Sequence, residues 1–148
     1  MPYGFVGGGL PQHVRTIAVL PFENETSIPE LQRQLQDVMR RELRNRLGVR
    51  EASEARADAL VRGTITRYDV DVPIGISTGR NSRPTATRRK LQILVDIEIV
   101  DQTDGKTLWQ RKGLTADGDY NEGREQEGRR LALEKLVNDV VDGAQSQW

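Results

Sequence analysis

A regular alternation of apolar and polar side chains occupies residues 87–101, near the middle of the chain. Every odd-numbered position from 91 to 99 carries Leu, Ile or Val, whereas Gln92, Asp96 and Glu98 lie between them. Because successive side chains of a β-strand point to opposite faces, this pattern predicts a strand with one buried and one wet face. Asp104-Gly105 then predicts a hairpin turn, and residues 107–116 are expected to return as the last strand. Because only one face of this hairpin is apolar, we expect a layer of other elements of the chain to cover that face and to leave the polar face exposed.

Two segments have the helical spacing that such a layer requires. The first helix is predicted over residues 28–47, and the second from about residue 121 to residue 143. Ser27 and Glu30 have the spacing of a capping box at the start of the first helix, and Gly48 can end that helix. The apolar positions of the two stripes are Leu31, Leu35, Val38, Met39, Leu43 and Leu47, then Leu133, Leu136, Val137, Val140 and Ala144.

Two more strands are expected in the first half of the chain. The first covers residues 16–22, a β-branched run that Pro21 and Asn24 close. The second covers residues 58–76, where the apolar positions change from odd to even numbers near Thr66-Arg67. A β-bulge at that point would keep both sets on the core face, and Pro73 would then lie toward a strand end. The two sets are Val61 and Ile65, then Tyr68, Val70, Val72, Ile74 and Ile76.

The predicted elements follow one another in the order β-α-β-β-β-α. A strand, a helix and a second strand predict a right-handed parallel crossover, and the remaining strands predict an antiparallel meander. The expected fold is therefore an α+β two-layer sandwich, with two helices packed on one face of a four-stranded mixed sheet. Residues 1–15 are expected to form a flexible glycine-rich lead. Residues 16–148 are expected to form a single α+β domain, because a chain of 148 residues suffices for one core.

Charge and composition argue against several classes of function. Lys and Arg together number 22, as do Asp and Glu, so the formal net charge is zero and no nucleic-acid partner is expected. Cysteine is absent, which rules out disulfides and thiolate metal sites. His13 is the only histidine, and we expect it to be an ordinary surface residue without an acid nearby. We therefore expect no catalytic residues, no metal site, no cofactor and no enzymatic activity.

The strongest candidate for a binding site is a basic segment. Residues 72–95 contain neither Asp nor Glu, and a loop rich in Gly, Ser, Thr and Pro is expected at residues 77–86. The planar guanidinium group of arginine pairs with phosphate through two hydrogen bonds. We predict that this positive pole binds a phosphate-bearing glycolipid or an anionic protein surface; the alternative is an ordinary solvated loop. The candidate residues are Arg80, Arg83, Arg88, Arg89 and Lys90.

Several segments, taken in order, resemble one family of bacterial envelope proteins. They are Tyr3-Gly4-Phe5-Val6-Gly7-Gly8-Gly9-Leu10-Pro11, Ala18-Val19-Leu20-Pro21-Phe22-Glu23-Asn24-Glu25-Thr26, Ala57-Asp58-Ala59-Leu60-Val61-Arg62-Gly63-Thr64-Ile65, Leu108-Trp109 and the terminal Trp148. Together they are similar to the LptE-like outer-membrane lipoproteins of lipopolysaccharide assembly. In that family a lipidated cysteine opens the lead, and Met1-Pro2 stands at its place here. We expect the native protein to be lipid-anchored and this sequence to be a soluble form without the anchor.

The resemblance implies a non-enzymatic role at the periplasmic face of the outer membrane. Members of the family plug the lipopolysaccharide translocon, an LptD-type β-barrel, help it to assemble, and bind lipopolysaccharide at the last transport step. The implied partners are therefore that barrel, lipopolysaccharide and the membrane itself through the N-terminal lipid. The alternative is another type of envelope lipoprotein, because Val19-Leu20-Pro21-Phe22 also resembles the first strand of curli-secretion pore subunits and of cell-wall-synthase activators.

Overall fold

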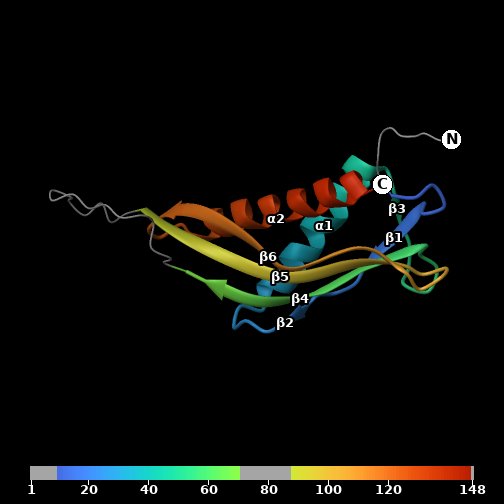
Figure 1. The fold of residues 1–148 in the computed structure, drawn as a ribbon. Helices are drawn as coiled ribbons and strands as arrows, with labels where there is room; N and C mark the ends of the chain where they lie inside the picture. The colour runs from blue at the N-terminus through green and yellow to red at the C-terminus, as the bar shows by residue number, and fades with distance from the viewer. Residues whose placement is uncertain (1–9, 71–87, 148) are drawn as a thin grey trace.

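The computed structural model describes residues 10–70 and 88–147. Within these ranges the chain forms a mixed sheet with two helices on one of its sides (Figure 1). The elements are β1 (Thr16–Val19), β2 (Glu23–Asn24), α1 (Glu30–Leu47), β3 (Arg50–Glu51), β4 (Ala59–Asp69), β5 (Arg88–Asp101), β6 (Thr107–Asn121) and α2 (Glu125–Gln147).

The strands are hydrogen-bonded in the order β3-β1-β4-β5-β6, and β2 pairs with β4 beyond the end of β1. β1 and β4 are parallel across α1, whereas β4, β5 and β6 form an antiparallel meander. The predicted α+β class, parallel crossover and meander are thus confirmed. The predicted strand count and element order are wrong, because the described residues hold six strands in the order β-β-α-β-β-β-β-α.

Pro21 explains one of the two extra strands. The expected single strand over residues 16–22 is broken after Val19, and pairing with β4 resumes only at Glu23. Val19 lies opposite Val61 and Glu23 opposite Thr64, so the first strand carries one residue more than its partner between these pairs. Proline has no N–H to donate to a ladder, so the interruption falls at its position. The other extra strand, β3, consists of two exposed charged residues with no apolar pattern to predict it.

The predicted bulge in the second long strand is present. The pairing of β4 with β5 shifts register between Ile65 and Arg67, and Ile65 is fully buried. Tyr68 is half-buried against the core, but Val70 is 41% exposed, so its predicted inward facing is wrong. The reason is that pairing with β5 ends at Asp69, and Val70 lies beyond the ladder. The rest of the predicted strand, residues 71–76 with Pro73, lies outside the described residues.

The hairpin of β5 and β6 agrees with the alternation that predicted it. All five odd-numbered apolar positions from Leu91 to Ile99 are buried on the side that faces the helices. Gly105 has a φ of +76° in the turn, and its N–H donates to the carbonyl of Asp101 at 2.8 Å. β6 continues to Asn121, beyond the predicted end at residue 116. The longer strand brings its acidic end beside the start of β5.

Both helices bury the predicted apolar stripes, but their starts differ from expectation. Leu31, Leu35, Met39 and Leu43 of α1 are fully buried, as are most positions of the α2 stripe. The predicted capping box is wrong: the N-cap of α1 is Pro29, which no side chain caps. Instead, the Thr26 hydroxyl accepts a hydrogen bond from the N–H of Ile28 at 3.2 Å. Gly48 ends α1 in the left-handed region, as predicted.

The second helix starts at Glu125 rather than near residue 121, and ends at Gln147 rather than at residue 143. Gly123, two residues before the helix, has a φ of +88°, so the chain is still in a turn there. α2 crosses β6 in very close contact where Gly118 and Gly128 face each other. A Cβ atom on Gly118 would lie 1.8 Å from the Gly128 carbonyl oxygen. Glycine at these positions therefore lets the two layers approach backbone to backbone.

Candidate functional site

Three of the five predicted basic residues open β5. Arg88, Arg89 and Lys90 are its first residues, and they lie beside the last residues of β6 at the end of the molecule where α2 begins (Figure 1). The structure thus brings these three together on a strand. Arg80 and Arg83 lie outside the described residues, and their part in a site stays a prediction.

The three cations pair with carboxylates of the neighbouring chain segment. Arg88 Nη2 lies 3.1 Å from Asp119 Oδ2, Arg89 Nη2 lies 3.4 Å from Glu122 Oε2, and Lys90 Nζ lies 3.4 Å from Asp117 Oδ2. We call these six residues the ion-pair ladder. Residues 88–95 contain no Asp or Glu, but in the folded chain carboxylates from the end of β6 and from Glu122 lie next to these cations. Pairing the two predicted strands outward from the Asp104-Gly105 turn would have placed these carboxylates beside the cations, if the last strand had been extended beyond residue 116.

A concave surface of about 750 Å³ adjoins the ladder at the start of α2, lined among others by Val70, Tyr120, Arg124 and Arg129. Arg129 is the cation that the sequence analysis missed. Its side chain is buried, although it is charged. The position is four residues before Leu133 of the apolar stripe, and this spacing was the one signal that placed it on the inner side of α2.

Arg129 is held by the residues packed around it. Its guanidinium group donates to Tyr68 Oη at 3.2 Å and to Glu125 Oε2 at 3.3 Å, and it lies over the Tyr68 ring. Tyr68 Oη itself donates to Glu125 Oε2 at 2.6 Å. Burial, with the Glu125 hydrogen bond, raises the pKa of Tyr68 to about 12. Tyr68 is therefore a neutral donor at physiological pH. Arg129 and Glu125 form an ion pair at the wall of the concave surface, so the group as a whole has no net charge.

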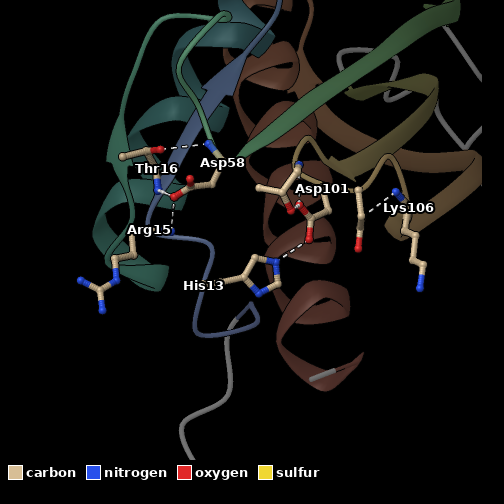
Figure 2. Close-up of polar contacts among 8 residues, drawn as sticks. His13, Arg15, Thr16, Asp58, Asp101 and Lys106 are labelled. Atoms are coloured by element: carbon tan, nitrogen blue, oxygen red, sulfur yellow. Dashed lines mark hydrogen bonds and ion pairs between the residues drawn. The ribbon is translucent and has the colours of Figure 1, made fainter.

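A second polar cluster lies at the opposite end of β5, around Asp101 (Figure 2). A ring nitrogen of His13 bonds to the Asp101 carboxylate, which also accepts hydrogen bonds from the N–H of Thr103 at 2.9 Å and from its hydroxyl at 2.6 Å. Next to it, Asp58 accepts from the N–H groups of Arg15 at 2.8 Å and of Thr16 at 3.0 Å. The expectation that His13 has no acid nearby is wrong, because the chain brings in a residue 88 positions away.

These contacts shift the pKa values of the cluster. The hydrogen bond to Asp101 raises the pKa of His13, although its ring is 53% exposed. Burial acts to raise the pKa of Asp101, but the hydrogen bonds from Thr103 and His13 outweigh it and lower that pKa to about 2. Backbone hydrogen bonds from Arg15 and Thr16 lower the pKa of Asp58.

The cluster holds the segment before β1 against the turn between β5 and β6. Val14 of that segment is buried in the main core.

Among the described residues, no group of three or more His, Asp or Glu side chains has an arrangement that could hold a metal ion. In the same ranges neither α1 nor α2 is apolar enough over a sufficient length to cross a membrane.

A family model described as lipopolysaccharide-assembly, LptE, matches residues 14–144. The chain belongs to the LptE family. The match runs from the buried Val14 to the buried Ala144 and so covers both layers of the fold. The family resemblance in the sequence is thereby confirmed. A sequence comparison with curated proteins finds no match.

Solved structures of PelC and of two lipoproteins are similar in fold to this LptE-family chain. The PelC dodecamer from Paraburkholderia phytofirmans has a TM-score of 0.58 and 21% identity, with 93% of this chain and 94% of that chain covered. Lipoprotein GNA1162 from Neisseria meningitidis has a TM-score of 0.52 and 16% identity, with 86% and 96% covered. A minor lipoprotein from Acinetobacter baumannii has a TM-score of 0.50 and 17% identity, with 90% and 92% covered. At these identities the likeness concerns the fold.

Proposed function

We propose that this protein is a lipid-anchored outer-membrane lipoprotein that plugs an LptD-type β-barrel, helps it to assemble, and binds lipopolysaccharide during insertion into the outer leaflet. The observation that carries the proposal is the LptE-family match over residues 14–144. The role needs no catalytic residues, because it consists of filling a lumen and holding a ligand.

The face of the sheet that the helices leave uncovered supports the plug role. It carries charged and polar side chains that pair with one another, such as Arg62 and Glu98 at 2.7 Å. The N–H of Gly113 donates to Asp96 Oδ1 on the same side at 2.8 Å. The interior of a large outer-membrane barrel is polar, so a wall of this kind meets side chains of similar character there.

The first residues of β5 support lipopolysaccharide binding. Arg88, Arg89 and Lys90 present three cations on adjacent positions, and Arg89 also lines the concave surface to which Arg129 contributes. Arginine and lysine bind phosphate through charge-assisted hydrogen bonds, and lipid A carries clustered phosphates. Arg80 and Arg83 precede these residues in the chain and belong to the same proposed site.

The ligand proposal is tested by replacing all five basic residues with Gln and measuring affinity for lipid A across a salt series. We expect weaker binding with an unchanged fold, and the largest loss at low salt, where screening is least. The control replaces five exposed arginines elsewhere with Gln, which changes the net charge equally: Arg33, Arg41, Arg44, Arg50 and Arg56. Equal affinities of the two variants would refute the assignment of these residues.

The partner proposal is tested on the full-length lipidated protein extracted from membranes. We expect it to co-purify with one copy of a large outer-membrane barrel. Deleting the gene should also reduce the amount of correctly assembled barrel in the outer membrane. Purification of the lipidated protein without any barrel, under conditions that preserve membrane complexes, would contradict this role.

A second candidate is a ring-forming envelope subunit. It is favoured by the similarity in fold to the PelC dodecamer over 93% of this chain. Mass measurement of the purified domain separates the two, since a plug is expected to be monomeric without its barrel. A homo-oligomeric ring would favour this second candidate.

A further inference from the structure

The ion-pair ladder places an acidic segment directly beside the proposed phosphate-binding cations. In the antiparallel register Lys90 lies opposite Asp119, and Arg88 lies opposite Asn121. The ion pairs run diagonally across this register, from Arg88 to Asp119 and from Lys90 to Asp117. Arg89 lies opposite Tyr120, which is buried in the core on the helix side of the sheet, and Arg89 pairs with Glu122 just after the end of β6. Each of the three cations therefore has its own carboxylate.

These ion pairs are weak enough to exchange. The six side chains are between 30% and 59% exposed, and exposed ion pairs are screened by water and salt. A phosphate monoester carries close to two negative charges and three acceptor oxygens, so it competes well with a single carboxylate for an arginine. The geometry points to a direct exchange of partners, in which phosphate takes the place of carboxylate.

We propose that Asp117, Asp119 and Glu122 act as built-in competitors that lower the affinity of Arg88, Arg89 and Lys90 for phosphate-bearing lipid. This inference rests on the proposed lipopolysaccharide-binding function. The ladder is neutral as a whole, so it attracts an isolated phosphate weakly from a distance. Several phosphates held close together replace several carboxylates at once, so the ladder selects clustered phosphates over single ones and leaves the bound lipid able to dissociate.

The test is a variant that removes the three competing charges, Asp117→Asn, Asp119→Asn and Glu122→Gln. Asn at position 117 keeps an oxygen for the hydrogen bond that Gln92 Nε2 donates at 3.0 Å, so the fold is retained. The probe is a phosphatidylcholine vesicle with or without lipid A. Release of three exposed ion pairs should tighten binding to the lipid A vesicles about tenfold.

The matched control is Glu51→Gln, Glu98→Gln and Asp142→Asn. These acids pair with Arg44, Arg62 and Arg46 away from the ladder, and their removal changes the net charge by the same amount. We expect the control to change affinity less than threefold, because distant exposed charges are screened. Equal tightening by both variants, or no tightening by the ladder variant, would overturn the proposal.

One further variant separates this inference from the proposed function. Arg88, Arg89 and Lys90 are replaced with Gln in the background that already lacks the three acids. If these cations are the ones released, the tenfold gain disappears; if the gain persists, the acids act elsewhere and the inference is wrong. Loss of binding by the five-residue Gln variant tests the function itself, whatever the acids do. A wild-type protein that fails to bind, beside a ladder variant that binds, would support competition.

Discussion

The contact between α2 and β6 makes Gly118→Ala the most decisive substitution in the fold. A Cβ atom at this position would lie 1.8 Å from the carbonyl oxygen of Gly128, 2.7 Å from its carbonyl carbon and 3.1 Å from the nitrogen of Ala132. All three are backbone atoms of α2, so no side chain can rotate away. Relief of the clash requires the helix to move off the sheet by roughly 1 Å or more, since non-bonded carbon and oxygen atoms do not approach closer than about 3 Å.

Such a movement opens the main core. Overpacking a well-packed interior costs about 1–3 kcal/mol, and here the strain falls on backbone rather than on side chains. We therefore expect Gly118→Ala to lower the free energy of unfolding by about 3 kcal/mol. Leu136 and Val140, which are fully buried on α2, would lose contacts as the helix shifts.

Gly143→Ala is the informative comparison. Its Cβ atom would lie 2.7 Å from atoms of the Trp109 ring, which is a side chain and can adjust. Replacing a mid-helix glycine with alanine also favours the helix by about 1 kcal/mol, so the net loss should be clearly smaller than for Gly118→Ala. Urea unfolding followed by circular dichroism measures both variants. A Gly118→Ala protein as stable as wild type, within about 0.5 kcal/mol, would refute the backbone-contact argument.

Two more predictions concern the sheet and its polar end. Ile97→Asp should unfold the domain because it puts an unpaired charge into the core, whereas Glu98→Gln should change the free energy of unfolding by no more than about 0.5 kcal/mol; similar losses in both would contradict the facing of β5. The contact between His13 and Asp101 should make stability depend on pH. The raised pKa of His13 gives a contribution that is complete below its ordinary value of 6.5 and is lost as the pH rises through the folded value. The lowered pKa of Asp101 gives one that is complete above its ordinary value of 3.8 and is lost as the pH falls toward about 2. The stability difference between wild type and His13→Ala should therefore be largest between about pH 4 and pH 6.5; urea midpoints across a pH series measure it, and a difference independent of pH would show that the contact is only steric.

Much of the site is absent from local sequence patterns. Arg88, Arg89 and Lys90 are recognisable as a basic run, but their partners become visible only when β6 is followed to Asn121. The spacing of Arg129 from Leu133 places it on the inner side of α2, but its burial and its hydrogen bond depend on Tyr68 in a distant strand. The hydrogen bond between His13 and Asp101 likewise joins two segments that are brought together only when the sheet has formed.

The sequence by itself determined the elements whose signal is local. The alternation through Leu91 and Ile99, the helix end at Gly48 and the bulge between Ile65 and Arg67 each follow from the period or conformation of a few neighbouring residues. Tertiary structure alone decided where charged groups find partners and which short exposed strands join the sheet. Both depend on the register between segments that are far apart in the chain. A charged side chain can be solvated by water or pair with any of several partners, whereas an apolar side chain is stable only when it faces the core.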